Sequence, residues 1–275
     1  MKIKDFIFFT RPHGWKGYML MGILGLLVSK HIPNASMIIY FLLALSSYLS
    51  FSFAINNYFD VEEDKHEKHT KNPLAKGRIS YKEAKLIILI SAVASILFTA
   101  LINKNAIWYM VVMIMVSAMY SSKPIKLKGR FLLDVVSHSL FFGVMIFLYP
   151  FIVFNIGINK ITVLTSILIA YISINLELRN HYNDYEHDKR AGVKTTAVTL
   201  GKEKTGKIIT AMNTLYPLIY LGALIYGFGF SHISIPAIIS IIYMLSIIFY
   251  KKMFRLFDIF VNITFLIFLF ILYSV

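Results

Sequence analysis

Two clusters of carboxylate and amide side chains in this 275-residue sequence share one spacing. Each has an Asn followed by two Asp at intervals of four residues: Asn56, Asp60 and Asp64 in the first, and Asn180, Asp184 and Asp188 in the second. On a helix with about 3.6 residues per turn, such positions project from nearly one face and form a ladder of oxygen atoms. Mg²⁺ characteristically binds one or two carboxylates together with substrate phosphates. The ladders therefore predict a Mg²⁺ site for a phosphorylated substrate, with the four aspartates as catalytic residues.

Basic loops follow both ladders, at residues 65–78 and 189–196, and a third basic loop at 120–130 begins with Tyr120. Their Lys and Arg side chains are suited to clamp a diphosphate beside Mg²⁺. For any single Lys, the alternative is that it only follows the positive-inside rule, and Tyr120 also suits an interfacial aromatic belt. One acidic cluster alone is equally well explained as a solvated helix end. Two clusters of identical pattern favour a functional site.

Membrane-spanning helices must position these ladders. Hydrophobic residues make up 57% of the chain and charged residues 15%, with a mean hydropathy of +0.68, whereas soluble domains have about 45–50% and about 25%. Each span needs about 20 apolar residues. The nine candidate segments are 14–31, 35–58, 83–102, 105–121, 131–154, 161–182, 206–228, 232–250 and 257–274. The sequence therefore predicts an all-α, polytopic protein of about nine transmembrane helices around a central cavity, as a single domain over residues 1–275.

The distribution of charge orients the predicted spans. When Lys and Arg are assigned to alternate ends of nine spans, 25 of the 28 fall on one side and only Lys30, Lys104 and Lys160 on the other. The positive-inside rule then predicts a multi-pass protein of the cell membrane with a cytoplasmic N-terminus, cytoplasmic ladder loops and an outside C-terminus. This pattern accounts for the net charge of +14 without a nucleic acid partner. The absence of Cys excludes disulfides and thiolate chemistry.

The two clusters, in this order, resemble the motifs of the UbiA superfamily of intramembrane prenyltransferases. Residues 56–64 fit N-[DN]-x-x-D-x-x-x-D, and residues 184–195 read D-x-x-x-D-x-x-x-G-x-K-T. Further similarities extend from Arg11-Pro12-His13 to Leu200-Gly201. The resemblance implies that a polyprenyl diphosphate binds through Mg²⁺, that its allylic carbon–oxygen bond ionises, and that an acceptor nucleophile then attacks. A water-poor site within the lipid bilayer would protect the allylic cation from water.

The resemblance also implies roles for single residues. The implied Mg²⁺ ligands are Asn56, Asp60, Asp64, Asn180, Asp184 and Asp188, and the implied substrate-binding residues are Arg11, Lys68, Lys71, Arg78, Tyr120, Lys123 and Lys194. Many family members have Arg directly before Pro-Leu, where this chain has Asn72. A hydrophobic aromatic or quinone-precursor acceptor is slightly favoured over a glycerol-phosphate ether-lipid acceptor, because Asn180 and the Gly-x-Lys-Thr run look closer to that class.

Two other classes of function stay open at this stage. A secondary transporter would use acidic helix ends for ion coupling, although such sites favour the membrane midplane and broken helices. A catalytically silent scaffold would need no chemistry from the ladders. Zinc is disfavoured because the histidines near the ladders do not form a closed set of nitrogen or sulfur donors at ligand spacing. No role is assigned to Asp134, His138 or Glu177.

Overall fold

The computed structural model describes residues 2–65, 70–249 and 253–275, and within these ranges it contains helices and no strands. The α-helices are α1 (Ile3–Thr10), α2 (Lys16–Val28), α3 (Ala35–Phe59), α4 (Val61–Lys65), α5 (Tyr81–Ile102), α6 (Ile107–Ser121), α7 (Leu133–His138), α8 (Met145–Val153), α9 (Lys160–Asn183), α10 (Tyr185–Arg190), α11 (Thr196–Leu200), α12 (Lys202–Phe228), α13 (Ser234–Phe249) and α14 (Met253–Ser274). Four 3₁₀ turns are η1 (Pro12–Gly14), η2 (Lys104–Ala106), η3 (Leu127–Gly129) and η5 (Phe230–His232), and η4 (Ser139–Val144) is π-helical. The all-α prediction is confirmed for the described residues.

Six helices are long and apolar enough to cross a membrane: Ala35–Phe59, Tyr81–Ile102, Leu133–Val153, Lys160–Asn183, Lys202–Phe228 and Phe254–Ser274. The third of these joins α7, η4 and α8 into one span. The other three predicted spans correspond to α2, α6 and α13, which have 13, 15 and 16 residues. A span usually needs at least about 17 residues. The described residues therefore support six candidate spans, and the count of nine stays a prediction.

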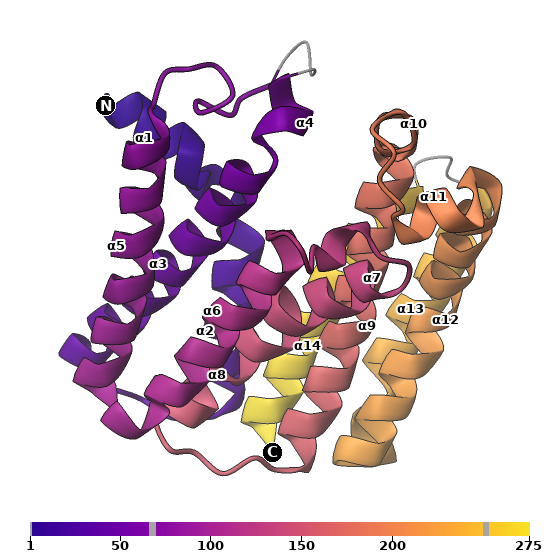
Figure 1. Ribbon diagram of the computed structural model, residues 1–275. Coiled ribbons are helices and arrows are strands. Elements are labelled where there is room, and N and C mark those ends of the chain that lie inside the picture. The colour runs from indigo at the N-terminus through magenta and orange to yellow at the C-terminus, as the bar shows by residue number, and fades with distance from the viewer. Residues whose placement is uncertain (1, 66–69, 250–252) are drawn as a thin grey trace.

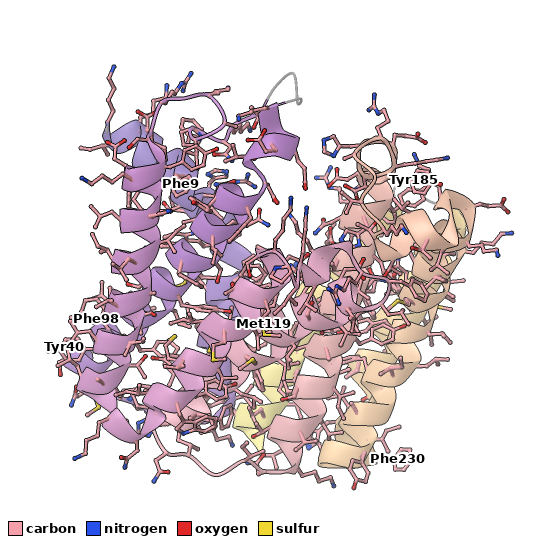
Figure 2. All side chains as sticks on the ribbon, in the orientation of Figure 1. Phe9, Tyr40, Phe98, Met119, Tyr185 and Phe230 are labelled. Atoms are coloured by element: carbon pink, nitrogen blue, oxygen red, sulfur yellow. The ribbon has the colours of Figure 1, made fainter. Side chains whose placement is uncertain are left out.

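The long helices pack side by side in a bundle with two distinct ends (Figure 1). The N-terminus, α4 and α10 lie at one end, and the C-terminus lies at the other. Figure 2 likewise places Phe9 and Tyr185 toward the first end and Phe230 at the second. Both ladders therefore lie at the end that holds the N-terminus. Which end faces the cytoplasm stays a prediction from the charge pattern.

Side-chain caps fix where the two ladder-bearing helices begin. At the start of α3, Asn34 Oδ1 accepts a hydrogen bond from Met37 N at 3.0 Å. At the start of α9, Asn159 and Thr162 form a reciprocal capping box. Such caps satisfy amide groups that a helix N-terminus leaves unpaired. Because each ladder closes the far end of its helix, these caps also help to set where the ladders lie.

The span Leu133–Val153 is the most enclosed of the six. Its apolar window is 72% buried, against 22% for the corresponding window of α5. Glycines allow neighbouring helices to approach it: a Cβ on Gly143 would lie 2.5 Å from Ser173 Oγ on α9, and a Cβ on Gly25 of α2 would lie 2.0 Å from the carbonyl oxygen of Phe147. Both distances are too short for real atoms. Close packing at these glycines therefore places α2 and α9 against this central span.

The π-helical segment η4 interrupts the central span between α7 and α8. His138 directly precedes it, and Phe141 and Phe142 belong to it. Segments of this kind are rare and occur frequently at functional sites. The part of the bundle around η4 is therefore a candidate region for chemistry.

Candidate active site

Each ladder crosses a junction between two helices. Asp60 separates α3 from α4 with φ −90° and ψ 1°, and Asp184 separates α9 from α10 with φ −89° and ψ 6°. The prediction that each ladder follows one uninterrupted helix is therefore wrong, because both helices end just before the first Asp. Hydrogen bonds continue across the junctions, from Asp64 N to Asp60 O at 2.8 Å and from Asp188 N to Asp184 O at 2.9 Å. The two ladders thus share their backbone conformation as well as their spacing.

Asn72 organises the loop beside the first ladder. It is 0% exposed, and its Nδ2 donates to Asp64 Oδ2 and to the carbonyl oxygen of Asn57, both at 2.7 Å. The Asn57 side chain donates to the carbonyl oxygen of Phe9 at 2.7 Å and accepts a hydrogen bond from Arg11. The buried Asn72 therefore orients the carboxylate of Asp64. Arg11 lies next to the first ladder through its contact with Asn57.

The segment between α6 and α7 brings two cations to the first ladder. Lys126 forms an ion pair with Glu63, and Lys128 forms one with Asp60. The side chains of these lysines are only 17% and 13% exposed. Lys123, which was predicted to bind substrate from this loop, is exposed. The sequence thus indicated the correct loop, but it did not single out the two lysines that meet the carboxylates.

The same segment also contacts the second ladder region, through α7. Asp134 is 0% exposed and accepts hydrogen bonds from Thr196 N at 2.6 Å and from Thr196 Oγ1. Its Oδ2 lies 3.2 Å from His181 Nδ1, within ion-pair distance but without hydrogen-bond geometry. Leu132 N donates to Thr196 Oγ1 at 2.8 Å. The chain from α6 to α7 therefore links the surroundings of both ladders.

The Asn of each ladder is held by its amide nitrogen. Asn56 Nδ2 donates to Ser121 Oγ at 3.4 Å, and Asn180 Nδ2 donates to Glu177 Oε2 at 2.9 Å. These bonds turn the amide oxygen away from the neighbouring acceptor. The oxygen is the atom of an amide that binds a hard cation such as Mg²⁺. The orientation of both asparagines therefore fits their predicted role as metal ligands.

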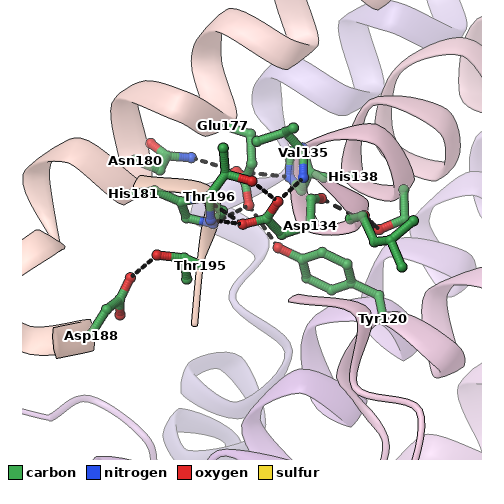
Figure 3. A network of polar contacts seen from close by, with 12 residues as sticks. Tyr120, Asp134, Val135, His138, Glu177, Asn180, His181, Asp188, Thr195 and Thr196 are labelled. Carbon is green, nitrogen blue, oxygen red and sulfur yellow. Dashed lines mark hydrogen bonds and ion pairs between the residues drawn. The ribbon is translucent and has the colours of Figure 1, made fainter. Parts of the chain in front are cut away.

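A buried polar network surrounds Glu177, with side chains from α6, α7 and α9 (Figure 3). Glu177 is 5% exposed and accepts a hydrogen bond of 2.6 Å from Tyr120 Oη. Its Oε2 lies 3.4 Å from His138 Nε2, and its Oε1 lies 3.3 Å from His181 Nε2. Tyr120, predicted to bind substrate, is thus placed in this network. The sequence analysis assigned no role to Glu177 or His138, although ionisable residues inside a predicted span are a signal of function.

A cavity of about 140 Å³ reaches this network from the first ladder. Asn56 lines it from α3 and Glu177 lines it from α9, with Tyr18, His138 and Phe142 between them. Binding pockets for whole ligands usually have about 300–1,000 Å³. The cavity therefore has room for the reacting groups of a substrate, and a long hydrocarbon chain must extend beyond it.

Asp188 lies in α10, beyond the predicted end of its span. Burial raises the pKa of its carboxyl, and the charge of Asp184 acts in the same direction, whereas His181 and His187 lower it. Thr195 Oγ1 donates to Asp188 Oδ2 at 3.5 Å. A cation close to a carboxyl favours its charged form. A cation bound at the second ladder would therefore favour the charged form of Asp188.

The remaining predicted substrate-binding residues lie in the loops after the ladders. Lys71, Arg78 and Lys194 are exposed, and Lys68 lies outside the described residues. Within residues 2–65, 70–249 and 253–275, no three His, Cys, Asp or Glu side chains form a group that could hold a metal ion. Mg²⁺ sites commonly combine few carboxylates with substrate phosphates.

The helical bundle and its paired Asn/Asp motifs define a class of membrane enzyme. The model of the UbiA prenyltransferase family matches residues 18–272, so the chain belongs to this family. The resemblance seen in the motifs is therefore confirmed, and the protein is an integral membrane prenyltransferase. The transporter and scaffold alternatives lose their support.

Among curated proteins, this chain is similar to digeranylgeranylglyceryl phosphate synthases. It is 28% identical to that of Sulfurisphaera tokodaii over 263 residues, which cover 90% of this chain and 84% of the relative. It is 25% identical to that of Pyrococcus horikoshii over 221 residues, which cover 78% of this chain and 76% of the relative.

Among solved structures, a UbiA homolog from Archaeoglobus fulgidus bound to GPP and Mg²⁺ superimposes with a TM-score of 0.72 at 20% identity. The similarity covers 98% of this chain and 100% of the homolog. At that identity the structural similarity establishes the fold alone. The curated relatives do not support the slight preference for an aromatic acceptor, because their name describes a product built on glyceryl phosphate.

Proposed function

We propose that this protein transfers a prenyl group from a polyprenyl diphosphate to a hydroxyl group of a glycerol-phosphate lipid, with Mg²⁺ as cofactor. The observation that carries this proposal is the position of the two ladders. They lie at one end of the bundle, with equivalent backbone junctions, and the α6–α7 segment links their surroundings. The acceptor class is taken from the relatives named digeranylgeranylglyceryl phosphate synthase.

The donor atoms present fit Mg²⁺. Both asparagines are held by nitrogen, and the remaining ladder groups are carboxylates, so all the predicted ligand atoms are oxygen. The residues that would hold the metal are Asn56, Asp60, Asp64, Asn180, Asp184 and Asp188. When bound, Mg²⁺ supplies positive charge that stabilises the diphosphate as the carbon–oxygen bond breaks.

The side chains of the protein contribute charge and enclosure to this reaction. Lys126 and Lys128 already lie against the first ladder, where their charges favour a diphosphate leaving group. Lys194 and Arg78 are exposed on the loops that follow the two ladders, where they add further positive charge. The aromatic walls of the cavity at Phe142 keep water from the allylic carbon, which would otherwise be hydrolysed.

The proposal is tested with purified protein in nanodiscs, given geranylgeranyl diphosphate and one of two acceptors. These are geranylgeranylglyceryl phosphate and an aromatic acid such as 4-hydroxybenzoate. Mass spectrometry is expected to detect the doubly prenylated glyceryl phosphate, and EDTA is expected to abolish its formation. Transfer to the aromatic acid alone would overturn the acceptor class. Movement of diphosphate across sealed liposomes without any covalent product would restore the transporter alternative.

A further inference from the structure

We infer that α1 and the start of α5 form a surface that binds anionic phospholipids of the bilayer, next to the first ladder. This surface is separate from the ladders and from the basic loops that follow them. The lipid is recognised by its negatively charged headgroup and by the upper part of its acyl chains. The inference does not depend on which acceptor the enzyme uses.

Helix α5 shows where the bilayer surface crosses this side of the bundle. Lys82, Leu86, Leu89 and Val93 follow one another at intervals of four, three and four residues, so they share one face of the helix. Lys82 is exposed, and each of the three apolar side chains is more than half exposed. In a spanning helix, exposed apolar side chains face lipid, and lysines near its end reach the headgroups. The acyl chains therefore begin at about Leu86, and the headgroups lie at the level of Lys82.

Helix α1 lies at this depth, beside α5. Phe6 lines the same groove as Leu86 and Ile90 of α5. Phe9 is 0% exposed and packs in one hydrophobic cluster with Ala84 of α5. Figure 1 shows the N-terminus at this end of the bundle. Because Leu86 and Ile90 are exposed toward lipid, Phe6 lies just inside the apolar boundary of the bilayer.

The exposed part of α1 is amphipathic. Ile3, Phe6 and Ile7 have the i, i+3, i+4 spacing of one helix face, and all three are exposed. Lys2 and Lys4 are exposed beside them. A helix that lies in the membrane interface buries its apolar side chains at the acyl boundary and keeps its lysines among the headgroups. The bilayer therefore covers the apolar face of α1.

The charge of this surface favours anionic headgroups. Its exposed basic residues are Lys2, Lys4, Lys82 and Lys85. Two acidic residues alternate with them in the sequence, but Asp5 is only 6% exposed, and Glu83 accepts hydrogen bonds from Ser80 N at 2.8 Å and from Ser80 Oγ at 3.0 Å. Glu83 thereby caps the start of α5. Lysines close to a bilayer surface attract anionic lipids, so the four exposed lysines define the class of lipid.

Hydrogen bonds at the end of α1 connect this surface to the first ladder. The carbonyl oxygen of Phe9 accepts a hydrogen bond of 2.7 Å from Asn57 Nδ2, and Arg11 donates to the Asn57 side chain. The carbonyl oxygen of Asn57 accepts a hydrogen bond from Asn72, which also donates to Asp64. The lipid surface and the first ladder are therefore parts of one connected structure.

The first test measures the depth of α1 in the bilayer. Because the chain has no Cys, Ile7→Cys is labelled with a fluorophore in nanodiscs. Lys76→Cys, in the loop after the first ladder, is the exposed control. Phosphatidylcholine with a nitroxide near the top of its acyl chain is expected to quench the label at position 7 about twofold or more strongly than the label at position 76. Equal quenching at the two positions would overturn the inference.

The second test measures the preferred headgroup. The nitroxide is carried either by phosphatidylglycerol or by phosphatidylcholine in otherwise identical nanodiscs. Phosphatidylglycerol is expected to quench the label at Ile7→Cys about twofold or more strongly, and high salt is expected to weaken this preference. The preference is expected to disappear when Lys2, Lys4, Lys82 and Lys85 are all changed to Gln. The matched control changes Lys204 and Lys207 of α12, which are also exposed, to Gln, and it is expected to keep the preference.

Three results would overturn the inference: equal quenching by the two lipids, an unchanged preference in the fourfold variant, or an equal loss of preference in the control, which would show an effect of net charge alone. Displacement of labelled phosphatidylglycerol by geranylgeranyl diphosphate would also overturn it, because the surface would then be a site for the donor. The salt dependence of the preference needs none of the Lys→Gln changes, so it tests the inference even if the fourfold variant does not fold. None of these measurements requires prenyl transfer, so their failure leaves the proposed function intact.

Discussion

Asn72 shows how one side chain serves the site without touching substrate. In the family pattern its position is often Arg, but here it is 0% exposed and bonded to Asp64 and Asn57. An Arg at this position would have to displace the loop and would leave buried polar groups without partners. The change Asn72→Arg is therefore expected to reduce the free energy of unfolding by about 1–3 kcal/mol. Thermal unfolding in detergent measures this, and Lys76→Arg, an exposed change in the same loop, is the control.

Asn72→Arg is also expected to raise the Mg²⁺ concentration needed for half-maximal activity, because Asp64 loses a hydrogen-bond donor that orients it. An Asn72→Arg variant with higher activity and unchanged stability would instead show that the site uses an Arg as relatives do.

The aspartates at the two junctions lead to a second prediction at the residue scale. Asp60→Asn and Asp184→Asn keep the size of the side chain but remove a negative charge from the metal site. Each variant is expected to lose about 100-fold or more in prenyl transfer. The unfolding temperature of Asp184→Asn is expected to stay close to that of the wild type, whereas Asp60→Asn also leaves Lys128 without its ion-pair partner and is expected to unfold at a lower temperature. Glu203→Gln is the control, because Glu203 is 82% exposed and paired with Lys207. Transfer that persists in both junction variants would contradict the metal-ladder mechanism.

At the scale of elements, the sequence predicted well those features that depend on local pattern. The predicted segment 35–58 became α3, and 161–182 became α9, within two residues at each end. The length of an apolar run is a local signal, and it was sufficient here. The junctions at Asp60 and Asp184 were missed because a spacing of four is the same in a straight helix and in one that ends before the Asp. The segment η4 was also missed, since hydropathy does not distinguish π-helical from α-helical hydrogen bonding.

The packing of α2 against α8 gives a prediction for a pair of helices. A Cβ at Gly25 would lie 2.0 Å from the Phe147 carbonyl oxygen, which is a backbone atom and cannot move independently of its helix. Gly25→Ala is therefore expected to separate these helices and to reduce stability by about 1–3 kcal/mol. Gly17→Ala in the same helix is the matched control, because no atom lies within 4 Å of its added Cβ. Equal unfolding temperatures of the Gly25→Ala and Gly17→Ala variants would contradict the close contact.

At the scale of the whole molecule, the site brings together residues that are far apart in the chain. Tyr120, His138 and Glu177 come from α6, α7 and α9 and meet only in the folded bundle (Figure 3). The spacing of motifs did not reveal their relation, because it connects only residues that are close in the sequence. The ladders were recognisable because each is contained within nine consecutive residues. Function that depends on distant partners required the structure.

The orientation of the bundle in the membrane is a prediction for the whole molecule. The chain has no Cys, so single cysteines can be introduced without background labelling. Lys207→Cys, on the ladder side, is expected to react with a membrane-impermeant maleimide only from the cytoplasmic face. Lys104→Cys is expected to react only from the opposite face. Labelling of both from one face would contradict the predicted alternation of spans.

The π-helical segment η4 places one extra residue in the central span, compared with a continuous α-helix between the same two ends. The extra residue changes the angular position, around the helix axis, of every residue that precedes it in the span. Deletion of Leu140, whose side chain is 43% exposed, would restore an α-helical register and rotate His138 by about 100° around the helix axis. The deletion is expected to abolish transfer, whereas Leu140→Ala keeps it. In this protein the residue inserted at η4 sets the angular position of α7, and with it which side chains of α7, His138 among them, line the cavity.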